Sequence, residues 1–227
     1  VVVGQAGERV AYLMVPKPRG LADLTRPVAF IDEAIPRHGV SRQIPVHALV
    51  QTHGALRDVQ ALAAHPRIES LSFGLMDFVS DHRGAIPQSG MSVKGQFEHP
   101  LVRRAKLEIA SACHAHGKQP AHCVVTEFSD GAALQASARR AADESGYTRM
   151  WSIHPSQIRP ILQAFAPDEQ QIHTASASLL AAAQADWAPI SHDGALHDRA
   201  SYRHFWQVLE RAHATGRHLP AEVAPWF

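Results

Sequence analysis

The sequence predicts an α/β protein built from parallel strands, each followed by a helix. Two stretches lead to this prediction, residues 48–54 (ALVQTHG) and residues 70–78 (SLSFGLMDF). Each is an apolar run that changes into polar residues and a glycine and then into helix-like sequence, which is typical of a buried parallel strand entering a βα loop. Loops at the carboxyl ends of strands carry the chemistry of α/β proteins. Asp77 is the carboxylate at these two strand ends, so it is the first candidate active-site residue; its alternative role is to cap the following turn.

Length and charge narrow the class of protein. The chain has 227 residues, enough for one sizeable α/β domain with a large core. Lys plus Arg number 22 against 21 for Asp plus Glu, and there is no basic block, so we expect no nucleic-acid partner. No apolar run approaches the ~18 residues of a membrane helix, so we expect no membrane contact. Cys113 and Cys123 match neither a disulfide framework nor a zinc motif, and they fit small buried hydrophobes in a reducing, cytoplasmic compartment.

In the first half of the chain, strands are expected where short unbroken apolar runs end in proline, glycine or polar residues. Helices are expected where apolar residues recur at helical spacing and the run stops near Pro36 or before Pro66, because a residue before proline resists the α conformation. The predicted strands are residues 10–15, 45–50 and 70–74, and the predicted helices are residues 21–38 and 55–64. Lys17 is expected at the carboxyl end of the first strand, where it would either form a structural salt bridge or contact the substrate.

In the second half, the polar span of residues 80–99 is expected to form a loop over the site, because connections this long are usually functional or mobile. The amphipathic helix of residues 101–116 is expected to pack inward through Leu107, Ile109, Ala110 and Cys113. Two further strands, residues 121–126 and 148–153, are each followed by a helix, residues 132–144 and a helix through Phe165. The caps expected for these two helices lie within residues 127–130 and at Ser156. The remainder is predicted as helices 168–185 and 198–215, with no further strand.

Several blocks of this sequence resemble the HpcH/HpaI aldolase and citrate lyase β-subunit family. They lie in the family's order along most of the chain: Gln51 to Leu56 (QTHGAL), Ala64 to Arg67 (AHPR), Phe73 to Phe78 (FGLMDF) and Ser152 to Ile158 (SIHPSQI). Within the family, the resemblance is to CoA-ester lyases of the malyl-CoA or citryl-CoA type.

The resemblance implies a (β/α)₈ TIM-type barrel. Residues 1–187 would supply its carboxyl-terminal five βα units, and residues 188–227 a helical lid or subunit-contact segment. Because a closed barrel needs eight units and family members carry further residues before this point, we expect the amino-terminal strands to be missing from the sequence.

The family's reaction breaks or forms a C–C bond next to a thioester, and the enolate that arises needs a positive neighbour, usually Mg²⁺. The resemblance places one metal ligand at Asp77 and the other, a glutamate in the family, at Gln51. An amide oxygen can bind Mg²⁺ but brings no charge, so affinity should fall. Three consequences of this substitution are open: another carboxylate supports the metal, the enzyme acts on a different substrate, or the protein has no catalytic activity.

The resemblance also implies that Met76, Asp77 and the run Ile153, His154 and Pro155 contact the substrate, whereas His154 could instead be a structural histidine bonded to loop backbone. Residues 191–202 resemble the carboxyl-terminal lid of the lyases, in which an aspartate from a neighbouring subunit acts as acid or base. Asp198 is the matching position. It is also a good helix N-cap, and both roles could hold.

These observations predict a Mg²⁺-dependent lyase acting on an acyl-CoA thioester or small organic acid, in a cytoplasmic homo-oligomer, a trimer or hexamer. Two other functions stay open: a CoA-independent 2-oxo-acid aldolase, and a non-catalytic CoA-ester-binding homologue or complex subunit.

Overall fold

The structure is a computed structural model that describes residues 1–126 and 130–227. It divides into two compact units, Val1–Ile161 and Leu162–Phe227. The sequence placed a boundary after residue 187. The contacts divide the chain earlier because helix α10 (Glu169–Gln184) shares a hydrophobic core with α11 (Arg199–Ala214). Among the described residues, no helix combines the length and the apolar character that a membrane crossing requires.

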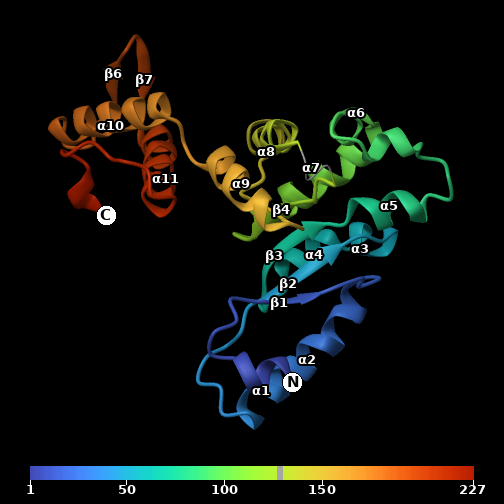
Figure 1. Cartoon of the computed structure of the whole chain (residues 1–227). Coiled ribbons are helices and arrows are strands. Elements are labelled where there is room, and N and C mark those ends of the chain that lie inside the picture. The colour runs from blue at the N-terminus through green and yellow to red at the C-terminus, as the bar shows by residue number, and fades with distance from the viewer. Residues whose placement is uncertain (127–129) are drawn as a thin grey trace. The chain divides into compact units, whose positions relative to one another are not determined.

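The first unit contains a five-stranded parallel sheet in the order β1-β2-β3-β4-β5 (Figure 1). Its strands are β1 (Leu13–Val15), β2 (Val46–Val50), β3 (Ile68–Phe73), β4 (Gln119–His122) and β5 (Arg149–Met150). The spatial order equals the chain order, as in successive βα units that wind in one direction. The five predicted strands and the parallel α/β class are therefore confirmed. In the described part of the chain, β1 and β5 each pair with one neighbour, so these strands form an open sheet.

Helices connect the strands largely where the sequence predicts them. The helices of this unit are α1 (Val2–Ala6), α2 (Leu21–Arg37), α3 (His53–Arg57), α4 (Val59–Ala64), α5 (Leu75–Asp81), α6 (Gly95–Glu98), α7 (Pro100–Ala115), α8 (Gly131–Ser145) and α9 (Ile158–Phe165). The helix predicted over residues 55–64 is split at Asp58 into α3 and α4. The span predicted as a loop, residues 80–99, contains the 3₁₀ turn η1 (Gln88–Met91) and α6. The cap predicted within residues 127–130 is Asp130, whose side chain accepts from Ala133 N, while residues 127–129 lie outside the described residues.

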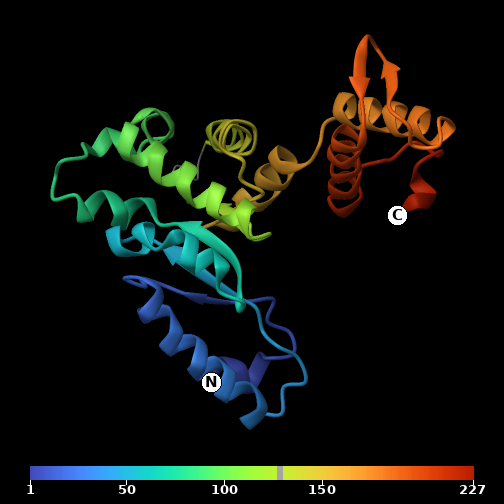
Figure 2. The same cartoon turned by 180° about the vertical axis from the view of Figure 1, so that it is seen from behind.

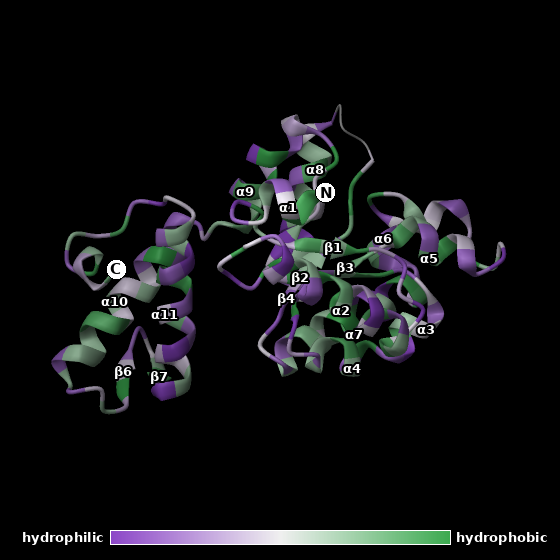
Figure 3. Cartoon of the chain, turned by 90° about the horizontal axis from the view of Figure 1, so that it is seen from below, coloured by the Kyte–Doolittle hydropathy of each residue, from purple (hydrophilic) through white to green (hydrophobic). Residues whose placement is uncertain are grey.

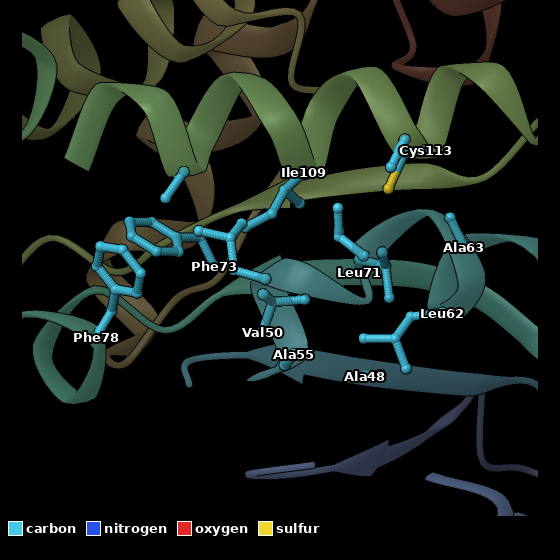
Figure 4. Close-up of a cluster of buried hydrophobic side chains, with 14 of the residues drawn as sticks. Ala48, Val50, Ala55, Leu62, Ala63, Leu71, Phe73, Phe78, Ile109 and Cys113 are labelled. Atoms are coloured by element: carbon cyan, nitrogen blue, oxygen red, sulfur yellow. The ribbon is translucent and has the colours of Figure 1, made fainter. Parts of the chain in front are cut away.

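The core of the first unit lies between one face of the sheet and the helices α2, α4 and α7. Val50, Leu71 and Phe73 point from the strands toward Ile109 and Cys113 on α7 (Figure 4). Figure 3 shows hydrophobic residues along β1 and β3.

Both cysteines are buried and unpaired by disulfide, as expected, and burial raises the pKa of the Cys113 thiol to about 12. One expectation for α7 is wrong. Leu107 is 40% exposed, and Lys106 takes the inward position, because the helical stripe that contains Ile109 and Cys113 passes through residue 106.

The second unit contains α10, α11 and a two-stranded antiparallel hairpin, β6 (Ile190–His192) and β7 (Ala195–His197), with a 3₁₀ turn at Ala224–Trp226 (Figure 2). The hairpin corrects the prediction that no strand follows residue 153. Asp193 and Gly194 form its two-residue turn with φ of 49° and 75°, the left-handed conformation that Asp-Gly hairpins prefer. The Asp-Gly dipeptide could have predicted this hairpin from the sequence.

The sheet face opposite the core carries polar side chains. His47 on β2 is 3% exposed, and its Nδ1 lies 2.6 Å from the Ser70 hydroxyl, whereas its buried Nε2 has no hydrogen-bond partner. A cavity of about 380 Å³ lies on this face, lined by His47, Ser72 and Trp151 among others. Burial lowers the pKa of His47 to about 4.

This shift makes stability depend on acid pH. Between pH 6.5 and about 4 the unfolded His47 binds a proton and the folded one does not, so the free energy of unfolding falls as the pH falls, by about 3 kcal/mol in all. Urea unfolding at a series of pH values should show a flatter slope in His47→Leu. The exposed-site control His116→Gln should keep the wild-type slope. His122, whose pKa burial also lowers, adds to the wild-type slope, so the difference between the two variants is decisive. Equal slopes would refute the assignment to His47.

Candidate functional site

The loops at the carboxyl ends of β1, β2 and β3 bring three side chains together. Lys17 Nζ lies 2.9 Å from Asp77 Oδ1, and Gln51 Nε2 donates to Asp77 Oδ2 at 2.6 Å. We call these residues the Lys17–Gln51–Asp77 cluster. The structure thus joins the two residues that the sequence assigns to a metal site, and it shows the salt bridge that was one of the two roles considered for Lys17.

Glycines permit this close approach. Gly74 follows β3 directly and precedes α5, whose first turn carries Asp77. A Cβ at Gly74 would clash with Gln51 Cβ, so a larger residue would push Gln51 away from Asp77. A Cβ at Gly54 would clash with the backbone carbonyl of Arg19. The glycine therefore allows the loop after β2 to lie against the loop after β1.

Side-chain hydrogen bonds hold the same loops. Thr52 caps α3 by accepting from Ala55 N, and its hydroxyl donates to the carbonyl of Pro18 at 3.0 Å. Pro18 follows Lys17, so this bond fixes the backbone beside the ammonium. Lys17 itself has a φ of 52°, in the left-handed region that costs a non-glycine residue on the order of 1 kcal/mol. The fold therefore holds Lys17 in an unfavourable backbone conformation next to Asp77.

The oxygen atoms of this cluster fit a weakly held divalent cation. Gln51 is 1% exposed, and its Oε1 is buried without a hydrogen-bond partner. Rotation of the amide would turn this oxygen toward Asp77, giving one carboxylate and one amide oxygen, both ligands that Mg²⁺ accepts. No group of three or more His, Cys, Asp or Glu that could hold a metal is found within the described ranges. Water or substrate would therefore complete the coordination shell.

Met76 lies beside Asp77 and lines an uncharged cavity of about 370 Å³. The other lining residues are Gln88, Ser89, Met91, Ser92 and Thr126. Most of them come from the polar span of residues 80–99, which contains two helical turns, so this span borders the cavity at Met76. That it forms a loop over the site stays a prediction. The cavity offers hydroxyl, amide and thioether groups to a ligand.

Ile153, His154 and Pro155 follow β5, which β4 separates from β3 in the sheet. His154 Nδ1 accepts from Ser156 N and lies 2.7 Å from the Ser156 hydroxyl. His154 therefore caps the 3₁₀ turn Pro155–Gln157, because its imidazole nitrogen accepts from Ser156 N. The N-cap role of Ser156 in the helix through Phe165 stays a prediction.

Gln157 is a residue whose structural part the sequence did not reveal. It is buried, accepts from Ile153 N at 2.9 Å and donates to the carbonyl of Val125 at 2.8 Å. It thereby anchors the loop after β5 to the segment that follows β4. Its place in the SIHPSQI block was the one signal that could have singled it out.

Asp198 lies in the second unit, where it caps α11. Its Oδ1 accepts from Ala200 N at 2.9 Å and from Ser201 N at 3.4 Å. The capping role is confirmed, and the proton-transfer role in a neighbouring subunit's site stays a prediction.

No protein-family model matches the sequence. The chain is 26% identical over 226 residues to an L-malyl-CoA/β-methylmalyl-CoA lyase of Cereibacter sphaeroides, covering 92% of this chain and 69% of that protein. A crystal structure of a citrate lyase from Burkholderia xenovorans is 54% identical, with a TM-score of 0.89 over 100% of this chain and 70% of its own. The fold also matches that of CitE from Mycobacterium tuberculosis in complex with magnesium, acetoacetate and coenzyme A, with 23% identity, a TM-score of 0.69 and coverage of 89% and 68%.

Proposed function

Because the chain belongs to the citrate lyase β-subunit-like family of carbon–carbon lyases, we propose that it breaks or forms the C–C bond next to the thioester of an acyl-CoA. The observation that carries the proposal is the Lys17–Gln51–Asp77 cluster at the carboxyl end of the sheet, beside an uncharged cavity. The name of the Cereibacter relative supports a malyl-CoA-type substrate, and the magnesium and coenzyme A bound to CitE support both the cation and the thioester.

In this proposal Asp77 and Gln51 hold Mg²⁺ through their oxygens. When bound, the ion supplies positive charge beside the enolate oxygen. Gln51 is buried, so its amide stays at the site, where rotation of the amide would turn its oxygen toward the ion. Met76 borders the space for the acyl group, Ile153, His154 and Pro155 contact the CoA ester, and Asp198 of a neighbouring subunit moves the proton at the reacting carbon.

We also propose that the five strands belong to a (β/α)₈ barrel, with residues 188–227 as a lid or subunit contact. Two observations support this: β1 and β5 each have one unpaired edge in the described structure, and the chain spans about 70% of the length of the matched Burkholderia structure. The assembly would be a cytoplasmic homo-oligomer, in keeping with the free buried cysteines.

One observation favours a second function, a CoA-ester-binding protein without turnover. Gln51 brings no charge to the site, and Lys17 neutralises Asp77, so the cluster has no net negative charge to attract Mg²⁺.

A panel of thioesters tests these functions. Malyl-CoA, β-methylmalyl-CoA, citramalyl-CoA and citryl-CoA would be assayed for cleavage with and without Mg²⁺, beside free 4-hydroxy-2-oxo acids. Magnesium-dependent cleavage of one thioester supports the lyase. Coenzyme A binding without cleavage of any ester supports the binding protein, and cleavage of the free oxo acids supports a CoA-independent aldolase.

Restoring a second carboxylate should strengthen the metal site. We expect Gln51→Glu to tighten Mg²⁺ binding about tenfold or more, because an anionic oxygen replaces a neutral one beside Asp77. Calorimetric titration with Mg²⁺ measures this directly. Gln60→Glu adds the same charge at an exposed position on α4 and should leave the affinity near that of the unmodified protein. Equal affinities for the two variants would contradict the assignment of Gln51 as a ligand.

A further inference from the structure

Both carboxylate oxygens of Asp77 are engaged within the protein. Oδ1 accepts from the Lys17 ammonium and Oδ2 from the Gln51 amide. A divalent cation binds carboxylate oxygen at about 2.1 Å, which leaves no room for an ammonium on the same side. The ion and these two donors therefore compete for one carboxylate.

The two donors differ in their freedom to leave. Gln51 is buried, so it can respond by rotating its amide in place. The Lys17 side chain is 63% exposed and can swing into solvent, while its backbone is held at a positive φ by the loop between Pro16 and Pro18. Its partner Asp77 is 50% exposed, so water screens the ion pair and the ammonium can leave it at little cost.

We propose that Lys17 is a built-in counter-cation of the metal site, which occupies Asp77 when no divalent ion is bound and must leave it when one binds. The inference rests on the proposed metal site between Asp77 and Gln51, and it does not depend on turnover. Lys17 then sets the affinity of the site. The metal must displace one positive charge, and the displaced ammonium remains close enough to repel it.

Removing the charge of Lys17 should therefore tighten metal binding. We expect Lys17→Met to bind Mn²⁺, a spectroscopic substitute for Mg²⁺, about three- to tenfold more tightly than the unmodified protein. Electron paramagnetic resonance of free Mn²⁺ during titration measures this affinity without substrate. The matched control is Lys94→Met, which removes an exposed lysine paired with Glu98 at 3.8 Å in another loop, and its affinity should not change.

A second variant guards against a folding defect. Lys17→Gly removes the same charge and also relieves the positive φ, so it should fold at least as well and show the same gain in Mn²⁺ affinity. Unchanged affinity in both Lys17 variants would overturn the proposal, as would the absence of Mn²⁺ binding in every form of the protein. A gain in affinity without cleavage of any thioester would uphold the role of Lys17 and refute the lyase function, so the two failures are distinct.

Discussion

Replacing Asp77 with alanine is expected to lower kcat/KM for malyl-CoA-type thioesters by at least about a hundredfold. Asp77 is the carboxylate on which the Lys17 ammonium and the Gln51 amide converge. Without it, the cluster keeps a positive charge and a neutral amide but has no anionic oxygen with which to hold a cation beside the developing enolate. Rates measured for the thioester that the panel identifies would check this loss.

Two further variants sharpen the test of Asp77. Asp77→Asn keeps the shape of the side chain and removes its charge, so it should lose nearly as much activity as the alanine variant. Asp81→Ala removes an exposed carboxylate at the end of the same helix, where it pairs with His53, and should change kcat/KM less than about threefold. Wild-type rates in Asp77→Ala would exclude the cluster as the reaction centre.

The second large effect is expected at Lys106, which is buried behind β4. Its Nζ lies 2.7 Å from Gln96 Oε1, 2.8 Å from His122 Nε2 and 3.8 Å from the centre of the Phe97 ring. The desolvation that accompanies burial lowers its pKa to about 8. Lys106 thus joins α6, α7 and β4 through one amine.

Lys106→Ala should lower the free energy of unfolding by about 3–5 kcal/mol, because it opens a cavity and removes the hydrogen bonds of the amine to Gln96 and His122. Lys106→Met fills most of the same volume and removes the cost of a buried charge, so it should lose less than half as much. Urea unfolding at pH 7 measures both. Equal losses of unfolding free energy in the two variants would show that the hydrogen bonds of the amine, and not the volume of the side chain, determine the stabilisation by Lys106.

The parallel strands could be predicted from the sequence, and the family resemblance placed Gln51 and Asp77 in one site. The structure brings these two side chains together because the carboxyl ends of neighbouring parallel strands meet at one edge of a sheet. The position of Lys17 was predicted as well, but its partner was not, since that contact depends on the conformation of the loop between two prolines.

Long-range packing explains the parts that were not predicted. The buried Lys106 looked like an ordinary polar residue of an amphipathic helix, because its partners are distant in the sequence. The proposed role of Asp198 at the cluster of a neighbouring subunit would depend on an assembly of subunits, which the local pattern of one chain does not encode.

Leu162–Phe227 buries its own set of apolar side chains, distinct from those of Val1–Ile161. Because each unit has a core of its own, the two cores can unfold at different temperatures or urea concentrations. A whole-molecule melting temperature then mixes two separate quantities. The effect of a substitution at His47 or Lys106 is therefore best measured with a spectroscopic probe in Val1–Ile161, the unit that contains both residues.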